Sequence, residues 1–339
     1  MARIYINSEQ KLIAFAKFIF VIILILIPIG IFENLTANSL PISLLGKVLN
    51  TLPYVDHESR LGLDRAQGPF DHPILLGVFC FAFFSIIFYL SAPENKLFSR
   101  VTNAVLVFLA GFTSLSSGPL AGMAAQLGLM AWGAIFKSIR GKWIILITGL
   151  LSVYFVVALF ANSSPIEVAF RYLTFNSGNA WARINIFNYG YASMLDYPMF
   201  GHGPNEWARP FWLGASIDMY WLVPGVRYGF PGLFLNLFVF AAAFYAVASQ
   251  KPKSHGINLC SKAYLFSLVG LLVAGLSVHF WNATYVSYMF VLGVGLWTVD
   301  AKVDDEAAET VDQSNRERIS QARRRRAQRS RTRLGKNET

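Results

Sequence analysis

Long apolar stretches recur through most of this sequence, and they constrain its fold more than any other feature. A helix rises about 1.5 Å per residue, so crossing the hydrocarbon core of a bilayer takes about 17–25 apolar residues. Eight stretches approach this length, and they lie near 12–32, 73–91, 101–116, 118–136, 143–161, 229–249, 263–281 and 284–300. The sequence therefore predicts an all-α integral membrane protein with about eight transmembrane helices in a polytopic domain over 1–300.

Charge is scarce, which agrees with a surface solvated by lipid. Charged residues make up 14% of the chain, against about one quarter in soluble domains. The first apolar stretch follows basic residues as in a signal peptide, but it is too long and has no convincing cleavage site. Both cysteines, Cys80 and Cys260, lie within apolar stretches, and no cluster has metal-ligand spacing. We therefore expect no metal and no cofactor.

The distribution of basic residues gives a topology. Eight spans place both termini on one side of the membrane, and the positive-inside rule assigns short basic loops to the cytoplasm. The connections assigned to that side contain Lys96, Arg100, Lys137, Arg140, Lys142, Lys251, Lys253 and Lys262. The sequence therefore predicts a multi-pass membrane protein with both termini cytoplasmic.

The last segment, 301–339, is polar, begins acidic and ends in a run of arginines. It has no apolar periodicity, so we predict a disordered tail. Beside a membrane, such a basic run favours contact with anionic lipid over nucleic acid, and no nucleic-acid partner is expected despite the net charge of +10.

Two segments assigned to the periplasmic side, 33–72 and 162–228, are much longer than the other connections. Long ordered loops frequently carry function. Apolar residues at helical spacing predict a short interfacial helix over 41–52 and an amphipathic helix between Asn179 and Pro198. The latter has an apolar stripe of Trp181, Ile184, Phe187, Tyr191 and Met194.

The basic residues of these two loops are almost all arginine, with Lys47 as the only lysine. They are Arg60, Arg65, Arg171, Arg183, Arg209 and Arg227. A guanidinium offers a rigid fork of donors that matches phosphate oxygens. The set predicts an anionic, phosphorylated ligand, whereas any single arginine has an alternative in pairing with a nearby acid or a lipid headgroup.

The second loop also contains candidate proton acceptors. His202 lies in a bend with Pro198, Gly201 and Gly203, whose amides could approach an anion, although a plain tight turn explains the glycines equally well. Asp218 follows where the chain re-enters the membrane, and either a partner such as Arg227 or a role as general base accounts for an acid there. No nucleotide-binding motif is present, so the energy for a reaction would have to arrive in the substrate.

Three stretches together resemble the O-antigen ligase and polymerase superfamily, in particular its exopolysaccharide polymerases. The first is 59–73, which contains Arg60 and Arg65, and the second is 115–119. The third combines Trp181 to Arg183, 198–203 and 216–232. Their order and separation are similar to those of the family, over residues 55–300.

This resemblance implies a GT-C-like, metal-independent glycosyltransferase that is a multi-pass protein of the bacterial inner (cytoplasmic) membrane. Such an enzyme polymerises or ligates oligosaccharide repeat units carried on undecaprenyl pyrophosphate, in exopolysaccharide or O-antigen-type polysaccharide synthesis. Carried over by motif, Arg60, Arg65, Arg183 and Arg227 would bind the pyrophosphate, and Arg183, His202 and Asp218 would be catalytic. The implied partners are the lipid-linked glycan, membrane lipid and other polysaccharide export or assembly proteins.

The chain departs from the family in two respects. Family members usually have more spans, and a Ser-Arg-Gly-like turn reads Ser116-Ser117-Gly118 here. Asp218-Met219 stands where ligases have a His-Asn pair, which favours a polymerase and leaves the base open between His202 and Asp218.

The alternative function is a membrane transporter or flippase for a lipid-linked glycan or another anionic solute. It predicts ionisable residues within the spans and an internal repeat, and the sequence shows neither. His279 and Asn282, near the end of one span, form a polar pair to which we assign a helix-end role.

Overall fold

The computed structural model describes residues 2–51, 57–173, 177–251 and 253–301. The described chain is all-helical and contains no β-strand. The predicted tail lies outside the described residues except for Ala301, as do 52–56 of the first long loop.

Five helical segments of the described chain are long and apolar enough to span a membrane. They are α2 (Glu9–Thr36), the joined α4 (Pro73–Ala82) and α5 (Phe84–Leu90), α8 (Lys142–Phe160), α11 (Val223–Ala248) and α12 (His255–Gly275). The chain is therefore an all-α protein with helices of membrane-spanning length and apolarity.

The remaining predicted spans also coincide with helices, which are shorter or less apolar. These are α6 (Leu97–Phe112), α7 (Ser117–Ile135) and α13 (Asn282–Val294) with α14 (Trp297–Asp300). The largest shift concerns the span predicted over 263–281, because α12 begins at His255 and ends at Gly275. Residues 276–281 form a connector rather than part of the span.

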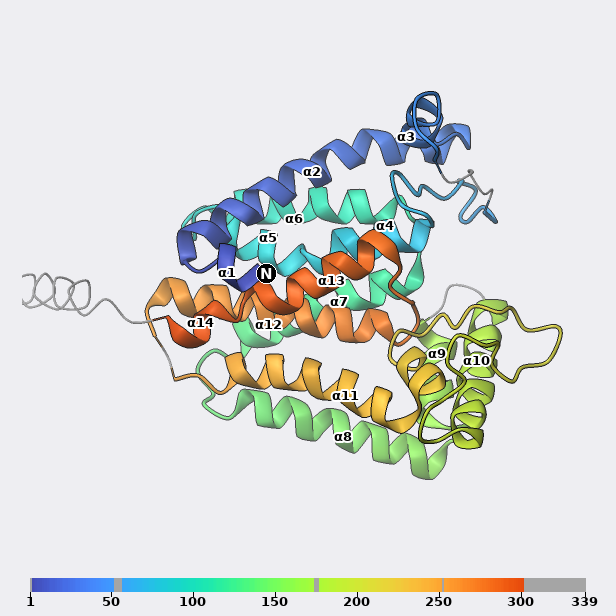
Figure 1. Ribbon diagram of the computed structural model, residues 1–339. Helices are drawn as coiled ribbons and strands as arrows, with labels where there is room; N and C mark the ends of the chain where they lie inside the picture. Colours follow the sequence, from blue (N-terminus) through green and yellow to red (C-terminus); the bar gives the residue numbers. More distant parts are fainter. Residues whose placement is uncertain (1, 52–56, 174–176, 252, 302–339) are drawn as a thin grey trace, which may run out of the picture.

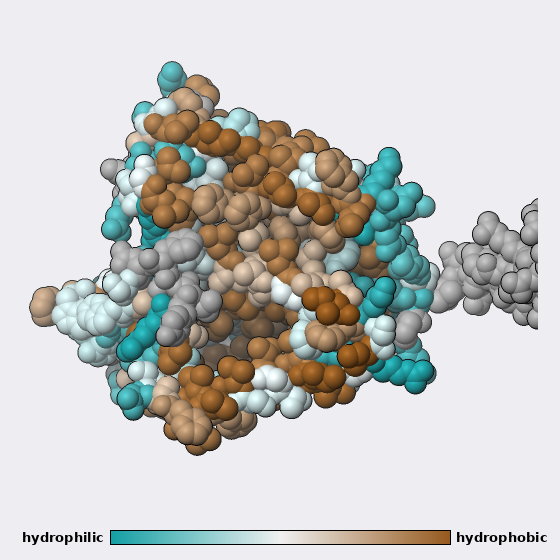
Figure 2. Space-filling model, turned by 180° about the vertical axis from the view of Figure 1, so that it is seen from behind, coloured by the Kyte–Doolittle hydropathy of each residue, from teal (hydrophilic) through white to brown (hydrophobic). Residues whose placement is uncertain are grey.

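Helix α12 lies at the centre of the bundle, against α7 and α5, with α2, α4, α6 and α13 around them (Figure 1). By contrast, α8 buries none of its most apolar window. Figure 2 shows an apolar belt bounded by hydrophilic residues at both ends, with a hollow near its middle. That distribution suits a protein surrounded by lipid between two aqueous layers.

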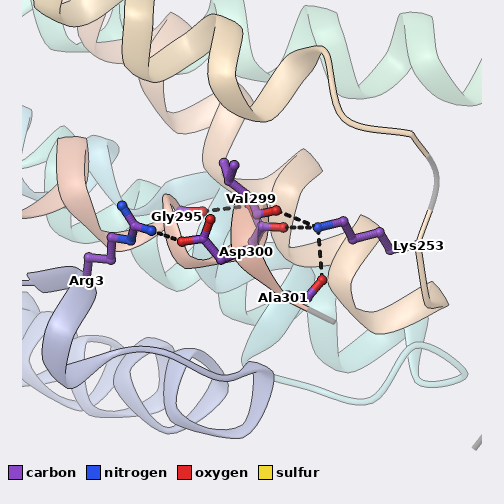
Figure 3. Close-up of polar contacts among 7 residues, drawn as sticks. Arg3, Lys253, Gly295, Val299, Asp300 and Ala301 are labelled. Atoms are coloured by element: carbon purple, nitrogen blue, oxygen red, sulfur yellow. Dashed lines mark hydrogen bonds and ion pairs between the residues drawn. The ribbon is translucent and has the colours of Figure 1, made fainter. Parts of the chain in front are cut away.

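The two ends of the described chain meet at one end of the bundle, which we call the terminal end. Arg3 of α1 (Ala2–Tyr5) forms an ion pair with Asp300 (Figure 3). Lys253, just before α12, donates to the carbonyls of Thr298, Val299 and Ala301 at 2.7–2.9 Å. These contacts join the N-terminal segment, the connection between α11 and α12 and the end of α14.

The two long loops lie at the opposite end, which we call the loop end (Figure 1). They contain α3 (Leu40–Leu45), α9 (Pro165–Leu173) and α10 (Ser177–Asp196). Helix α3 is shorter than the helix predicted over 41–52. Helix α10 confirms the predicted helix, but Trp181 and Tyr191 of its expected stripe are exposed, and Trp181 packs on Trp212 with ring centroids 5.0 Å apart.

Candidate functional site

The end of α2 fixes the first arginine-bearing loop. The buried carboxylate of Glu33 accepts hydrogen bonds from the backbone amides of Gln67 and Gly68, both at 2.8 Å, and from the Ser39 hydroxyl at 2.9 Å. The neighbouring Asn34 side chain donates to the Asp64 and Thr113 carbonyls. Buried acids normally need such donors, and here they hold the backbone on both sides of Arg65 in place.

The turn between α6 and α7 receives two arginines from this loop. Arg60 Nη1 donates to the Leu115 carbonyl at 2.9 Å. Arg65 Nε donates to the Ser114 carbonyl at 3.3 Å, and its Nη2 donates to Ser116 Oγ at 2.9 Å. The turn is one of the three stretches behind the family resemblance, so the structure brings the first and second stretches into contact.

Arg183 of α10 joins them from the second long loop. Its Nε donates to the Ser277 carbonyl at 3.2 Å, and its buried Nη1 has no hydrogen-bond partner among the described residues. Gly118 lies against the same Ser277, because a Cβ there would be 2.5 Å from its hydroxyl. We call Arg60, Arg65 and Arg183 the arginine cluster.

The guanidinium groups of the cluster lie close enough for the charge of one to lower the pKa of another. Burial, together with the positive charges of Arg60 and Arg183, lowers the pKa of Arg65 to about 10. Burial lowers the pKa of Arg183 as well, while Asp218 opposes and Arg60 adds to the effect. Burial is also the main cause of the lowered pKa of Arg60, and the negative charge of Glu58 opposes it. Each group remains charged at neutral pH, so the cluster concentrates positive charge.

No ion pair within the described residues joins the cluster to a carboxylate. Arg209, from the same set of loop arginines, does pair with Glu206 at 3.1 Å, as the alternative interpretation of single arginines expects. Three buried or half-buried cations that lie together, with no ion-paired acid among the described residues, are costly unless a further anion is present. The cluster therefore has the electrostatics of an anion site.

Aromatic and imidazole rings extend the site away from the cluster. His72, the N-cap of α4, packs on His57 with ring centroids 4.3 Å apart and on Trp281 at 6.2 Å. Burial, then the charge of His57 and then those of Arg65 and Arg60, lower the pKa of His72 to about 3. His72 is thus neutral at ordinary pH and adds no further charge beside the cluster.

The connector 276–281 between α12 and α13 is the part of the site that sequence reasoning missed. Its Ser277 carbonyl holds Arg183, and its Val278 carbonyl accepts from the Tyr220 amide at 3.0 Å. Asn282, directly after it, donates to Asp71 at 2.5 Å. The signal available in the sequence is the run of polar and aromatic residues from His279 to Asn282 at the end of an apolar stretch, a position that favours a helix-end role.

An apolar cavity of 1090 Å³ lies beside the connector, between α11 and α13. Most of its lining is apolar, as in Leu235, Val239, Val286 and Met289. Its polar lining comprises Tyr220, Arg227, Asn236, His279 and Asn282. A cavity with an apolar length and a small polar group suits an amphiphile whose head carries charge.

Arg227 does not join the arginine cluster. It lies in the first turns of α11, before the kink at Gly229, and is exposed at the cavity. Its positive charge adds to burial in lowering the pKa of His279 to about 4. Of the four predicted phosphate-binding arginines, the structure thus gathers three, and it places the fourth at the cavity, across the connector.

The glycine bend packs backbone against backbone on the start of α11. Gly201 and Gly229 have φ of 65° and 70°, and a Cβ at either would come within 2.4 Å of the facing main chain. The amides of Gly201, His202 and Gly203 all donate to protein carbonyls. The suggestion that these amides bind an anion is therefore wrong for this structure, and the tight-turn interpretation holds.

The two predicted bases lie around a second, polar cavity of 380 Å³. His202 lines this cavity, and its Nε2 bonds the hydroxyl of Ser193 at 2.7 Å, which ties the bend to α10. Asp218 accepts a hydrogen bond from Ser216 Oγ at 2.5 Å, and its negative charge raises the pKa of Arg183. Ser216 and Ile217 line the polar cavity, whereas Asp218 is not part of its lining.

Within the described residues, no group of three or more His, Cys, Asp and Glu side chains is arranged to hold a metal ion. In comparisons with known proteins, no protein-family model and no curated protein matched this chain. The motif resemblance described above therefore stays a prediction, and the function is inferred from the chemistry of the site.

Proposed function

We propose that the protein is a periplasmic-face glycosyltransferase that polymerises or ligates oligosaccharide repeat units carried on undecaprenyl pyrophosphate. The observation that carries the proposal is the arginine cluster, whose charge has no paired acid among the described residues. A pyrophosphate supplies the missing negative charge, and its oxygens match the guanidinium forks.

The apolar cavity supports a lipid carrier rather than a free nucleotide sugar. Its walls come from α11 and α13, two helices of the apolar bundle, so a polyprenyl chain could leave the lipid phase without crossing water. Arg227 and the connector link its polar part to the cluster. The proposed topology has eight spans in a GT-C-like arrangement, with the loop end periplasmic.

In this mechanism the arginines act on the leaving group. As the bond between the anomeric carbon and the pyrophosphate oxygen breaks, negative charge accumulates on undecaprenyl pyrophosphate. Donors that are fixed before the reaction stabilise such charge without reorganising, which is the largest contribution in many transfer enzymes. Glu33, Asn34 and the 114–116 turn fix the donors here. Arg183 brings an unpartnered Nη1 into the same cluster.

A transfer assay tests the proposal. Purified protein in lipid nanodiscs is supplied with lipid-linked oligosaccharide extracted from source cells that lack this gene, and extended glycans are resolved by electrophoresis. We expect wild type to produce a ladder, and Arg65→Ala, Arg183→Ala and Asp218→Ala to lose it. Arg171→Ala, an exposed loop-end arginine outside the cluster, is the matched control and retains extension.

The same assay separates the transporter alternative. Movement of the lipid-linked saccharide across the bilayer without extension would replace the glycosyltransferase by a flippase. Full extension by all three variants would contradict the placement of the reaction at these residues.

A further inference from the structure

The apolar and polar cavities share one wall, and this wall contains few residues. The side chains common to both linings are Val223, Arg227, His279 and Trp281. Arg227 and His279 are therefore the ionisable groups that face both spaces. A reaction between a molecule in one cavity and a molecule in the other would take place across them.

The linings of the two cavities differ in chemistry. The apolar cavity suits the lipid of the donor, as argued above. The polar cavity is lined by Asn205, Glu206 and Ser216 with the indoles of Trp207 and Trp281. Hydrogen-bonding side chains next to flat aromatic faces match the hydroxyls and apolar faces of a sugar ring, and its 380 Å³ falls within the range of small-molecule sites, about 300–1,000 Å³.

His279 is held rigidly in the shared wall. The residue before it accepts the Tyr220 amide through its carbonyl, and the ring packs on Tyr220 and Trp281 with centroids 6.2 Å and 5.7 Å away. Its Nδ1 is buried with no hydrogen-bond partner among the described residues. Buried polar atoms without a partner are uncommon in folded proteins, and a catalytic role is one of their physical explanations.

The other candidate bases are already engaged. His202 uses Nε2 to bond both the hydroxyl and the carbonyl of Ser193, at 2.7 Å and 3.2 Å, so it fastens the glycine bend to α10. Asp218 accepts a hydrogen bond from Ser216, its charge raises the pKa of Arg183, and it lines neither cavity. The polar wall between the cavities is therefore left to His279 and Arg227.

Building on the proposed function, we propose that the polar cavity binds the acceptor saccharide and that His279 takes the proton of its attacking hydroxyl. The acceptor oxygen forms the new bond to the anomeric carbon of the donor. The bond from that carbon to the pyrophosphate breaks, and undecaprenyl pyrophosphate leaves with the electron pair. The proton passes to His279 and then to water, so atoms and charge balance.

The electrostatics give this step an order. Burial and the Arg227 charge keep the pKa of His279 near 4, which makes it neutral but a weak base in the free protein. The negative charge of the bound donor's pyrophosphate offsets the positive charge of Arg227 and raises the pKa of His279 toward working pH, where a general base is most effective. Donor binding therefore activates the base. The other titratable groups around the shared wall are Tyr220, Tyr228, Tyr285, His202 and Glu206.

The test uses the full chain in nanodiscs with two readouts for each variant: transfer rate, and affinity for undecaprenyl pyrophosphate alone. We expect His279→Gln to lower the transfer rate by about 100-fold or more while changing the affinity less than about threefold. We also expect the variant to lose the acidic limb of the pH–rate profile. His279→Gly regains part of the rate when imidazole is added. His255→Gln, an exposed histidine at the terminal end, is the matched control and keeps the wild-type rate.

Asn205→Ala tests the polar cavity separately. It is expected to raise the KM for the acceptor severalfold with kcat little changed, since Asn205 contacts the acceptor and not the reacting atoms. Normal transfer by His279→Gln, with wild type active, would overturn this inference and leave the proposed function standing. An inactive wild type that does not transfer at all would overturn the proposed function and the inference together.

Discussion

Two buried arginines at opposite ends of the bundle make similar hydrogen bonds in different electrostatic surroundings. Arg65 at the loop end and Arg100 at the terminal end are 6% and 5% exposed, and each donates to the main chain of a turn. Arg65 has Arg60 and Arg183 as like-charged neighbours, and the charge of Glu58 opposes their effect on its pKa. Arg100 instead lies near Glu94, whose pKa is lowered mainly by its hydrogen bond to His255 and further by charges that include Arg100.

We propose that this difference separates a structural arginine from one that binds a ligand. Burial and carbonyl partners are common to both, so they carry no information about a ligand. Like-charge neighbours distinguish the loop end, because such an arrangement costs stability until an anion arrives. The predictions below follow from that contrast.

The largest effect is expected from replacing each of the two buried arginines, Arg65 and Arg100, by alanine in separate variants. Arg65→Ala should weaken binding of undecaprenyl pyrophosphate by about 100-fold, since charge-assisted hydrogen bonds contribute about 1.5–3 kcal/mol each. Arg100→Ala should lower the melting temperature and leave the affinity within about threefold of wild type. Isothermal titration and thermal unfolding in detergent measure the two effects. Equal loss of affinity in both variants would remove the contrast.

Arg183→Met sharpens the comparison by separating stability from binding. Methionine retains much of the apolar volume and removes both a buried unpartnered Nη1 and one of three like charges. Without ligand, we expect the variant to be as stable as wild type or more stable, by up to about 1 kcal/mol. Affinity for undecaprenyl pyrophosphate should fall by about tenfold. A strongly destabilised Arg183→Met would assign this arginine a structural role like that of Arg100.

The pH dependence of stability should carry a signature of His72. Its pKa is about 3 in the folded protein and about 6.5 in the unfolded chain. The unfolded state therefore binds more protons between these values, so the stability contributed by neutral His72 is fully present above pH 6.5 and is lost as the pH falls toward 3. His72→Gln should flatten this part of the profile, as followed by melting temperature against pH. If the slope of stability against pH were the same in His72→Gln as in wild type, the pKa of His72 would not be lowered in the folded protein.

The smallest effect on ligand binding is expected at the terminal end. Lys253→Met leaves the carbonyls of Thr298, Val299 and Ala301 without the cation that bonds them (Figure 3). We expect a loss of about 1 kcal/mol in stability and no change in affinity for undecaprenyl pyrophosphate, both measured as above. A change in affinity would mean that the two ends are coupled through the bundle.

The helices were predictable from the sequence because apolar length is a local property. Each predicted span coincides with a helix or a joined pair, and α10 begins and ends within two residues of its predicted limits. Five of the segments meet the length and apolarity of a span. The chain near Leu276 was misassigned, since its apolar residues continue the pattern of α12 beyond the point where the helix ends.

The arginine cluster was only half predictable. The preference for arginine over lysine in the two long loops identified the candidate residues. Which of these arginines lie together depends on segments far apart in the chain, such as Ser114–Ser116 and Ser277. The same limit explains Arg227, which was grouped with the cluster and lies across the connector instead. His279 was missed for a related reason, because its role follows from two cavities that no local pattern encodes.

The central claim is that the arginine cluster recognises a lipid-linked pyrophosphate. It is tested most directly by the affinities of the full-length protein for undecaprenyl pyrophosphate and for undecaprenyl monophosphate, measured side by side in nanodiscs. The account predicts that wild type prefers the pyrophosphate by about tenfold or more and that Arg65→Ala and Arg183→Met abolish the preference. Equal affinity of wild type for the two lipids, or an unchanged preference in both variants, would contradict it.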